Sequence, residues 1–277
     1  MTALVATDLD RTLIYSAGAL AEGTAPASPT VCVEHLQGEP LSHMTVRATA
    51  LLRSLARMAV VLPTTTRTVD QFRRIDLPGA PWRYAVTSNG GTILADGEPD
   101  HAWRSGVDRA VRDSAASLTD LGAELDRLGT PDWILKRRTA DDLFCYLVVD
   151  LAAMPSTFVQ DWGHWCAERG WNVSQQGRKV YAMPDAVCKS RAVAEVRARL
   201  IADGTLPDTA PILAAGDGAL DAEMLRAADA AIRPRHGELH ALGWECPGLT
   251  VTTASGGGAA EEILQWFTNR IPTGAAT

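Results

Sequence analysis

Two aspartates, two residues apart, follow a short apolar run near the start of the chain. Residues 4–7 (Leu-Val-Ala-Thr) are typical of a buried strand, and Asp8 and Asp10 come directly after it. Because side chains alternate along a strand, the two carboxylates point the same way only while the backbone stays extended. Neighbouring carboxylates repel each other unless they share a cation or a proton. The pattern therefore indicates a metal site, a nucleophile or an acid–base pair, with a solvated surface turn as the alternative.

Two further apolar runs also end in polar clusters. Residues 59–63 precede Thr64–Thr68, and residues 211–215 precede a segment that holds Asp217 and Asp221. In an open sheet of parallel strands, ligands bind beyond the carboxyl ends of the strands. We therefore expect the three polar clusters to meet at one edge of a sheet and to form a single site.

The residue types in these clusters suit phosphoryl transfer. Carboxylate oxygens are ligands for Mg²⁺, which keeps several waters and pairs with substrate phosphates. The hydroxyl and backbone N–H groups of residues 64–67 stand at a predicted helix start, which favours anion binding, and Lys189 adds a positive charge at the start of another helix. Positioning and charge neutralisation do most of the work in phosphoryl transfer, and an aspartate can serve as its nucleophile.

Strands and helices alternate along most of the chain, which predicts an α/β fold with a parallel sheet covered on both faces. A loop at 17–29 and a small hairpin or flap at 30–40 interrupt the alternation early. The middle of the chain has its own order of helix, two strands, helix and two strands, which predicts a separate module. Helices are expected at 45–58, 106–128, 156–169, 190–201, 221–228, 237–242 and 259–270, and strands at 83–87, 133–136, 143–149, 171–174, 179–182, 230–232 and 249–252.

Five of the eight tryptophans lie in the middle module. A stacking platform for a ligand is one interpretation, and packing between a sheet and its helices is the favoured one, because aromatic side chains dominate core energetics. The five are Trp103, Trp133, Trp162, Trp165 and Trp171.

Four segments together resemble the motifs of the haloacid-dehalogenase (HAD) superfamily. They are Asp8–Thr12 (Asp-Leu-Asp-Arg-Thr), a threonine after the second strand, Lys189 before a helix, and Gly216–Asp221 (Gly-Asp-Gly-Ala-Leu-Asp). Each motif alone is weak, but all four occur in the family's order. The resemblance implies a Rossmann-like parallel-sheet core.

The resemblance also implies a division into two domains. It covers residues 1–94 and 183–277, the expected HAD core. The module at 95–182 resembles the inserted α/β cap of the C2 type, found in the Cof-like and sucrose-phosphatase-like proteins of subfamily IIB. A Ser88–Gly91 turn near its entry adds to the likeness.

The carboxylates take separate roles in this resemblance. Asp8 is similar to the nucleophile, whose other oxygen would bind Mg²⁺. Asp10 is similar to the general acid and base, whose backbone carbonyl would also reach the metal. Asp217 matches a metal ligand, and Asp221 matches a direct or indirect one.

The resemblance assigns phosphate binding to a second group of residues. Thr65 matches the hydroxyl of the second motif best, with Thr64 and Thr66 as close rivals, and Lys189 matches the lysine that neutralises the phosphate. Arg67 either binds the phosphorylated substrate or pairs with a surface carboxylate. Thr66 or Thr68 is expected to cap the helix that follows.

Three features depart from the family's pattern or stay open. Arg11 stands where the family often has a small residue such as glycine, and its side chain could reach the substrate or the flap. Asn89 either contacts the substrate or only forms a turn. The segment 14–44 is long for this subgroup, so we expect a loop or flap insertion in the core domain.

Composition narrows the class of protein. The 277 residues carry a formal net charge of −7 with acidic and basic residues mixed, so we expect no nucleic-acid partner. No apolar run approaches the ~18 residues of a membrane span, and no signal-like run precedes Asp8. The five cysteines are scattered without a Cys-x-x-Cys pair, which predicts reduced thiols and a cytoplasmic location. Nothing in the sequence indicates the oligomeric state.

The sequence therefore predicts a Mg²⁺-dependent phosphatase that hydrolyses a small phosphorylated metabolite, such as a sugar or nucleotide phosphate, through an aspartyl-phosphate. A phosphomutase of the same superfamily is the first alternative. A non-catalytic sensor of a phosphorylated ligand is the second, although no motif residue is missing. The substrate has no recognisable signature.

Overall fold

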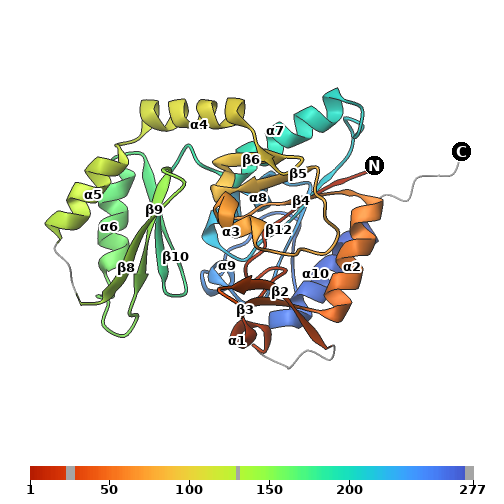
Figure 1. Cartoon of the computed structure of the whole chain (residues 1–277), viewed down its shortest axis with the longest axis horizontal. Helices are drawn as coiled ribbons and strands as arrows, with labels where there is room; N and C mark the ends of the chain where they lie inside the picture. Colours follow the sequence, from red (N-terminus) through yellow and green to blue (C-terminus); the bar gives the residue numbers. More distant parts are fainter. Residues whose placement is uncertain (23–28, 129–131, 272–277) are drawn as a thin grey trace, which may run out of the picture. The chain divides into compact units, whose positions relative to one another are not determined.

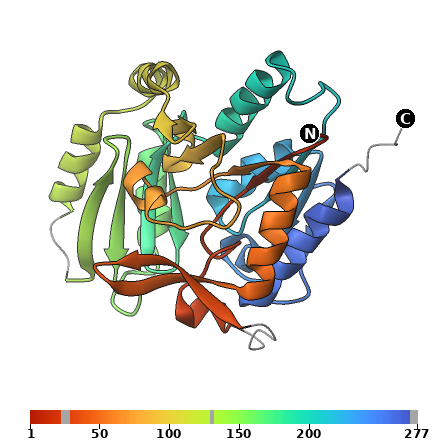
Figure 2. The same cartoon turned by 45° about the vertical axis from the view of Figure 1, so that its right-hand side comes forward.

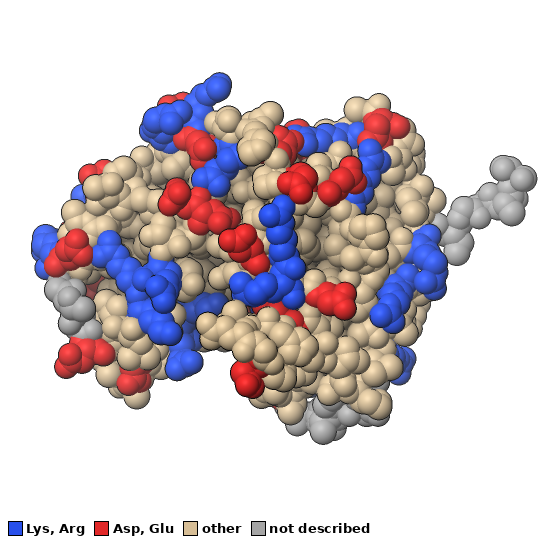
Figure 3. All heavy atoms as spheres, in the orientation of Figure 1, with Lys and Arg blue, Asp and Glu red and all other residues tan. Residues whose placement is uncertain are grey.

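The computed structural model describes residues 1–22, 29–128 and 132–271 (Figure 1). The chain forms two compact units, a core unit of Met1–Pro99 with Lys189–Thr277 and an inserted unit of Asp100–Cys188. Both boundaries lie a few residues beyond those expected from the sequence. Figure 3 shows acidic and basic side chains interspersed over one face of the molecule.

The core unit is built on a parallel sheet with the strand order β14-β13-β12-β1-β4. In β1, Thr7 pairs with Ala215 of β12 on one side and with Pro63 of β4 on the other. These three residues are the last of their strands, so the segments that follow start at the same edge, as the sequence predicts. The strands are β1 (Leu4–Thr7), β4 (Val60–Pro63), β12 (Ile212–Ala215), β13 (Ala230–Arg233) and β14 (Leu249–Val251).

Every residue of β1 is buried, so both faces of the sheet are covered at this strand. On one face α2 (Val46–Met58) and α10 (Gly256–Arg270) lie side by side (Figure 2), and their apolar side chains share a cluster with Val5 of β1. The pattern of α2 is helical, because its fully buried residues recur at Ala48, Leu52 and Leu55. The other described helices of the core unit are α1 (Ala17–Leu20), α3 (Val69–Arg73), α7 (Lys189–Ala202), α8 (Ala222–Ala227) and α9 (Glu238–Ala241), with 3-10 turns η1 (Ser88–Gly90) and η2 (Ala219–Asp221).

The predicted flap is a two-stranded hairpin of β2 (Thr30–Leu36) and β3 (Glu39–Thr45). Its turn residues Gln37 and Gly38 both have positive φ angles, 54° and 86°, as a tight hairpin turn of the primed type requires. The preceding segment was expected to be a loop throughout, but Ala17–Leu20 form the short helix α1, because the Ser16 side chain accepts a hydrogen bond from the Ala19 N–H. Residues 23–28 of that predicted loop lie outside the described residues.

The segment after β4 ends in a capped helix. Thr68 caps α3, and its hydroxyl and the Gln71 side chain form a reciprocal capping box. Beyond α3, an antiparallel sheet of β5 (Tyr84–Thr87), β6 (Thr92–Ala95) and β7 (Glu98–Pro99) adjoins the parallel sheet through a bridge between Thr64 and Val86.

The inserted unit contains an antiparallel sheet with the order β10-β11-β9-β8. The predicted helix over 106–128 is wrong in one respect, because it is two helices. Ser117 starts the second with a capping box to Asp120, and Ala116 is held by Arg169 and Trp171 through backbone and indole hydrogen bonds. The elements are α4 (His101–Ser114), α5 (Leu118–Arg127), β8 (Ile134–Ala140), β9 (Phe144–Val149), α6 (Phe158–Ala167), β10 (Trp171–Gln176) and β11 (Lys179–Pro184).

Three of the five tryptophans take part in packing, in line with the favoured interpretation. Trp162 and Trp171 are only 3% and 1% exposed, and Trp133 packs edge-on against Phe158, whereas Trp103 and Trp165 are partly exposed. Among the described residues, no helix has the length and apolar character needed to cross a membrane.

Candidate active site

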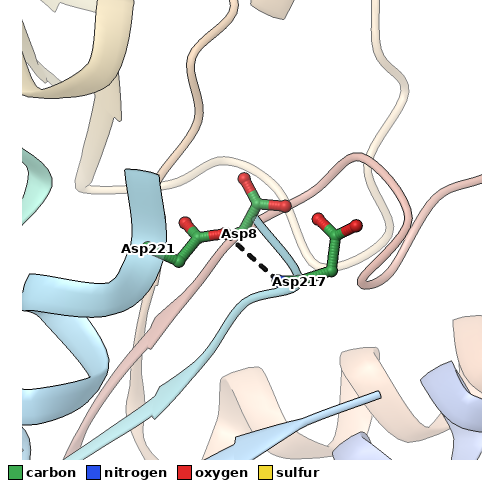
Figure 4. A group of neighbouring side chains, drawn as sticks. All are labelled: Asp8, Asp217 and Asp221. Atoms are coloured by element: carbon green, nitrogen blue, oxygen red, sulfur yellow. Dashed lines mark hydrogen bonds between the residues drawn. The ribbon is translucent and has the colours of Figure 1, made fainter. Parts of the chain in front are cut away.

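Three carboxylates meet at the carboxyl end of the core sheet (Figure 4). Asp8 follows β1, Asp217 follows the neighbouring strand β12, and Asp221 ends the 3-10 turn η2. Each offers an oxygen within 4.8 Å of the other two, and all three residues are buried. The parallel pairing of β1 with β12 is what brings residues so distant in sequence together.

Lys189, the first residue of α7, completes the cluster. Its ammonium nitrogen donates to Oδ1 of Asp8 and to Oδ1 of Asp221, both at 2.6 Å. The lysine side chain is only 1% exposed. A buried ammonium group is tolerated here because both of its hydrogen-bond partners are carboxylates.

The electrostatics of the cluster are set by burial. Burial raises the pKa of Asp8 to about 7, with further increases from Asp221 and Asp10, and Lys189 opposes them. Burial likewise holds the pKa of Asp217 well above its usual range. Three carboxylates face one buried ammonium, so the fully ionised cluster carries two negative charges in excess.

That excess fits a hard divalent cation. The donor set is oxygen only, as Mg²⁺ prefers, and a bound dication would offset the surplus charge. The half-exposed guanidinium of Arg11 also approaches the cluster, with its Nε 3.5 Å from Oδ2 of Asp217. The residues present are therefore suited to a magnesium site.

Two glycines make room for the carboxylates. A Cβ on Gly216 would lie 2.4 Å from Cγ of Asp221, and a Cβ on Gly237 would lie 2.5 Å from Oδ2 of Asp217. Gly237 also has a φ of +85°, which a side chain disfavours. Gly237 was not among the predicted site residues, because nothing in the sequence around a glycine before a short helix indicates a contact with a distant aspartate.

Asp221 organises the loop that carries Asp217. Its Oδ1 accepts from Lys189, and its Oδ2 accepts from the backbone N–H groups of Asp217 and Gly218 at 3.1 and 2.9 Å. Figure 4 shows the bond between Asp221 and Asp217 as a dashed line. These contacts favour a role for Asp221 in positioning Asp217 and Lys189 around a metal. Direct binding of a metal by Asp221 stays a prediction.

Asp10 lies outside the group of three carboxylates. Its two oxygens accept from Nε and Nη2 of Arg67 at 2.7 and 2.8 Å, a bidentate pair. The expected metal contact of Asp10 runs through its backbone carbonyl and stays a prediction. Arg67 also donates to the buried carboxylate of Glu34 at 2.7 Å. The structure therefore pairs Arg67 with carboxylates, and its predicted contact with the phosphorylated substrate stays a prediction.

The threonines of the second motif occupy the loop after β4. Thr65 is fully buried, and its hydroxyl oxygen accepts from the backbone N–H of Arg67 at 3.1 Å. Asn89 adjoins this loop, since its N–H donates to the Thr65 carbonyl at 2.9 Å. Thr66 is half-buried in the same loop. The phosphate contacts of Thr65 and Thr66 and the substrate contact of Asn89 remain predictions.

Thr12, inside the first motif, was not among the predicted site residues. Its hydroxyl donates to Oδ2 of Asp8 at 3.1 Å, while Lys189 holds the other oxygen. Both oxygens of Asp8 therefore have fixed partners. The first motif pointed to this contact, because Thr12 stands only four residues after Asp8, in the tight turn that follows β1.

The backbone at Arg11 has a conformation that favours glycine, the residue expected there from the resemblance. Its φ is +59°, the left-handed region, which costs a residue with a Cβ free energy. The guanidinium makes two bonds to Glu22 at 3.0 and 2.8 Å. The expected contact of Arg11 with the substrate stays a prediction.

The backbone at Arg11 yields a stability prediction. Arg11→Gly and Arg11→Ala both remove the pair with Glu22, and they differ in the cost of the left-handed conformation. We expect the glycine variant to be more stable by about 1 kcal/mol in urea unfolding. Equal stabilities, or a more stable alanine variant, would contradict the conformation described for this residue.

The raised pKa of Asp8 predicts a pH-dependent stability difference. A carboxyl whose pKa is about 7 in the folded protein and 3.8 when unfolded loses stability as pH rises between these values, because the folded state holds the proton longer. Asn cannot ionise. The metal-free Asp8→Asn variant should therefore gain stability over metal-free wild type as pH rises from about 4 to about 7, in denaturant titrations with a chelator. A constant difference would refute the raised pKa.

Comparison with known proteins supports the fold. No protein-family model matches the chain, and no curated protein matches it in sequence. Among solved structures, the sucrose-phosphatase from Synechocystis sp. PCC6803, in complex with sucrose and phosphate, is similar with a TM-score of 0.64 at 14% identity. The match covers 96% of this chain and 98% of that one.

Two more solved structures have the same organisation. A Thermoplasma acidophilum protein gives a TM-score of 0.55 at 14% identity, covering 97% of this chain and 99% of its own. A phosphatase of the HAD enzyme superfamily from Bacteroides thetaiotaomicron gives 0.52 at 12% identity, covering 97% and 96%. The resemblance found in the four motifs is confirmed at the level of the fold: this chain has the fold of the HAD-superfamily phosphatases, a parallel α/β core with an inserted α/β unit.

Proposed function

We propose that this protein is a Mg²⁺-dependent phosphatase that hydrolyses a small phosphomonoester, such as a sugar or nucleotide phosphate. The observation that carries the proposal is the buried group of Asp8, Asp217, Asp221 and Lys189, in which the lysine donates to both Asp8 and Asp221 and the three carboxylates lie close together. The fold shared with a sucrose-phosphatase adds support.

In the first step, an oxygen of Asp8 attacks the phosphorus atom of the substrate. A P–O bond forms to Asp8, and the P–O bond to the leaving group breaks. For this step Asp10 must carry a proton on one of the oxygens that otherwise accept from Arg67, and it gives that proton to the leaving oxygen, which departs as an alcohol. The product on the enzyme is an aspartyl-phosphate, the covalent intermediate that an aspartate nucleophile forms with a phosphoryl group.

In the second step, Asp10 takes a proton from a water molecule. The water oxygen bonds to phosphorus, the bond between phosphorus and Asp8 breaks, and inorganic phosphate leaves. Asp10 is again protonated and Asp8 again ionised. Asp10 thus acts first as a general acid and then as a general base. Such a group typically increases the reaction rate by ~10²–10⁴-fold.

Neutralising the phosphoryl charge is the task of the surrounding residues. Lys189 supplies a buried positive charge, and Thr65 and Thr66 supply hydroxyl and N–H groups. Asp8 and Asp217 would hold Mg²⁺, with Asp221 behind them. When bound, the cation offsets the charge on the carboxylates and on the phosphoryl oxygens. The inserted unit is proposed as the cap that selects the substrate and excludes water.

The test is phosphate release from a panel of sugar and nucleotide phosphates, with Mg²⁺ and with a chelator. We expect hydrolysis of at least one substrate, and its loss on chelation. Conversion to an isomer without phosphate release would favour a phosphomutase. Binding of a phosphorylated ligand without turnover would favour a sensor, and either result would refute the proposal.

A further inference from the structure

A fully buried carboxylate on the hairpin has no part in the mechanism above. The side chain of Glu34 is 0% exposed, although it comes from an outlying two-stranded element. It accepts from Ser42 at 2.5 Å, from Arg67 at 2.7 Å and from Arg74 at 3.2 Å. Burying a charge is costly even when it is paired, so packing alone gives no reason for an acid at this position.

The backbone of β2 turns this carboxylate inward. The register between β2 and β3 shifts on both sides of Glu34, which marks a β-bulge. As a result Val33 and Glu34 are both buried, although successive strand residues normally point to opposite faces. Bulges are found next to active sites, where they redirect a side chain. The Asp76 N–H donates to the Val33 carbonyl at 2.8 Å and fixes the hairpin there.

Arg67 joins Glu34 to the predicted acid and base. Its Nη1 donates to Glu34, while its Nε and Nη2 donate to the two oxygens of Asp10. The guanidinium is planar and its donors form a rigid fork. A carboxylate fixed at one edge of this plane therefore fixes the orientation of the carboxylate at the other edge.

We propose that Glu34 is a positioning residue that acts through Arg67 to orient Asp10 for proton transfer. The hairpin β2–β3 then belongs to the catalytic apparatus of the core unit, and this inference rests on the proposed phosphatase function. A purely structural ion pair that anchors the hairpin is the competing explanation.

Leaving groups of different basicity separate the two explanations. An alkoxide needs a proton from Asp10 to depart, whereas p-nitrophenolate departs without one, and kcat/KM covers only the steps up to that departure. For Glu34→Gln we expect kcat/KM to fall roughly 10- to 100-fold with a sugar phosphate and less than about 3-fold with p-nitrophenyl phosphate, with KM nearly unchanged. An anchoring defect would lower both alike.

A matched control is available on the same hairpin. Glu39→Gln makes the same chemical change at an exposed position, and both substrates should be hydrolysed as by wild type. Ser42→Ala keeps the charge of Glu34 and removes the hydrogen bonds that the Ser42 hydroxyl donates to Glu34 and accepts from Arg67. It should therefore show the same selective loss to a smaller degree. This variant carries the test if Glu34→Gln does not fold.

The outcomes distinguish this inference from the function on which it rests. Wild type that hydrolyses neither substrate would overturn the proposed function, and this inference with it. Active wild type, together with an equal loss on both substrates in Glu34→Gln and Ser42→Ala, or no loss, would overturn the role of Glu34 alone.

Discussion

Asp8→Asn should lose phosphatase activity by at least ~10⁴-fold in kcat, the scale seen when an enzyme loses its nucleophile. The amide cannot accept the phosphoryl group, and the neighbouring side chains are already committed to other contacts. Lys189 and Thr12 hold the two oxygens of Asp8, and Asp221 is bonded to its own loop.

The same variant should keep its fold, which separates lost chemistry from lost structure. Asparagine has the shape of a protonated aspartate, and the raised pKa of Asp8 means that ionisation at this position destabilises the metal-free protein. The midpoint of thermal unfolding at pH 8 should be equal to that of wild type or higher. Activity within tenfold of wild type in a folded Asp8→Asn would exclude Asp8 as the nucleophile.

Lys189→Met should be the most destabilising of these substitutions, by about 3–5 kcal/mol, because it leaves buried carboxylates without their positive partner. The lysine lies between Asp8 and Asp221 and is almost fully enclosed. Methionine fills a similar volume, so the loss of charge is the main change. Urea unfolding at pH 8 in the presence of a chelator measures it.

A double variant tests the cause of that loss. In Lys189→Met combined with Asp8→Asn, one of the unpaired carboxylates is gone, so the double variant should be more stable than Lys189→Met alone. Residues in one charge network couple by ~0.5–3 kcal/mol, and a coupling of this size is expected here. Additive effects would mean that the lysine acts through packing and not through its charge.

The framework of the site could be predicted because it depends on local patterns. Apolar runs that end in Asp8, Thr64–Thr68 and Asp217 identify strands and their carboxyl ends, and a parallel sheet brings such ends together whatever the details of packing. The threonine cap at Thr68 was likewise a local signal, since its partner lies three residues away.

Features that depend on distant contacts could not be predicted. The helix expected over 106–128 is divided where Ala116 bonds to Arg169 and Trp171, which lie more than fifty residues further along the chain. The capping box of Ser117 that starts the second helix is itself a local signal. The inward turn of Glu34 depends on a bulge, which strand patterns do not reveal. The pairing of Arg67 with Glu34 likewise depends on where that bulge places the glutamate.

The most direct test of the central claim is to capture the phosphoryl group on Asp8. Asp10→Asn lacks the base for the second step, while p-nitrophenyl phosphate needs no acid in the first, so the intermediate should accumulate. After an acid quench, mass spectrometry should find one phosphoryl group on the peptide that contains Asp8, removable with hydroxylamine and absent in Asp8→Asn. Stoichiometric release of p-nitrophenol with an unmodified protein, or a phosphoryl group on another residue, would contradict the account.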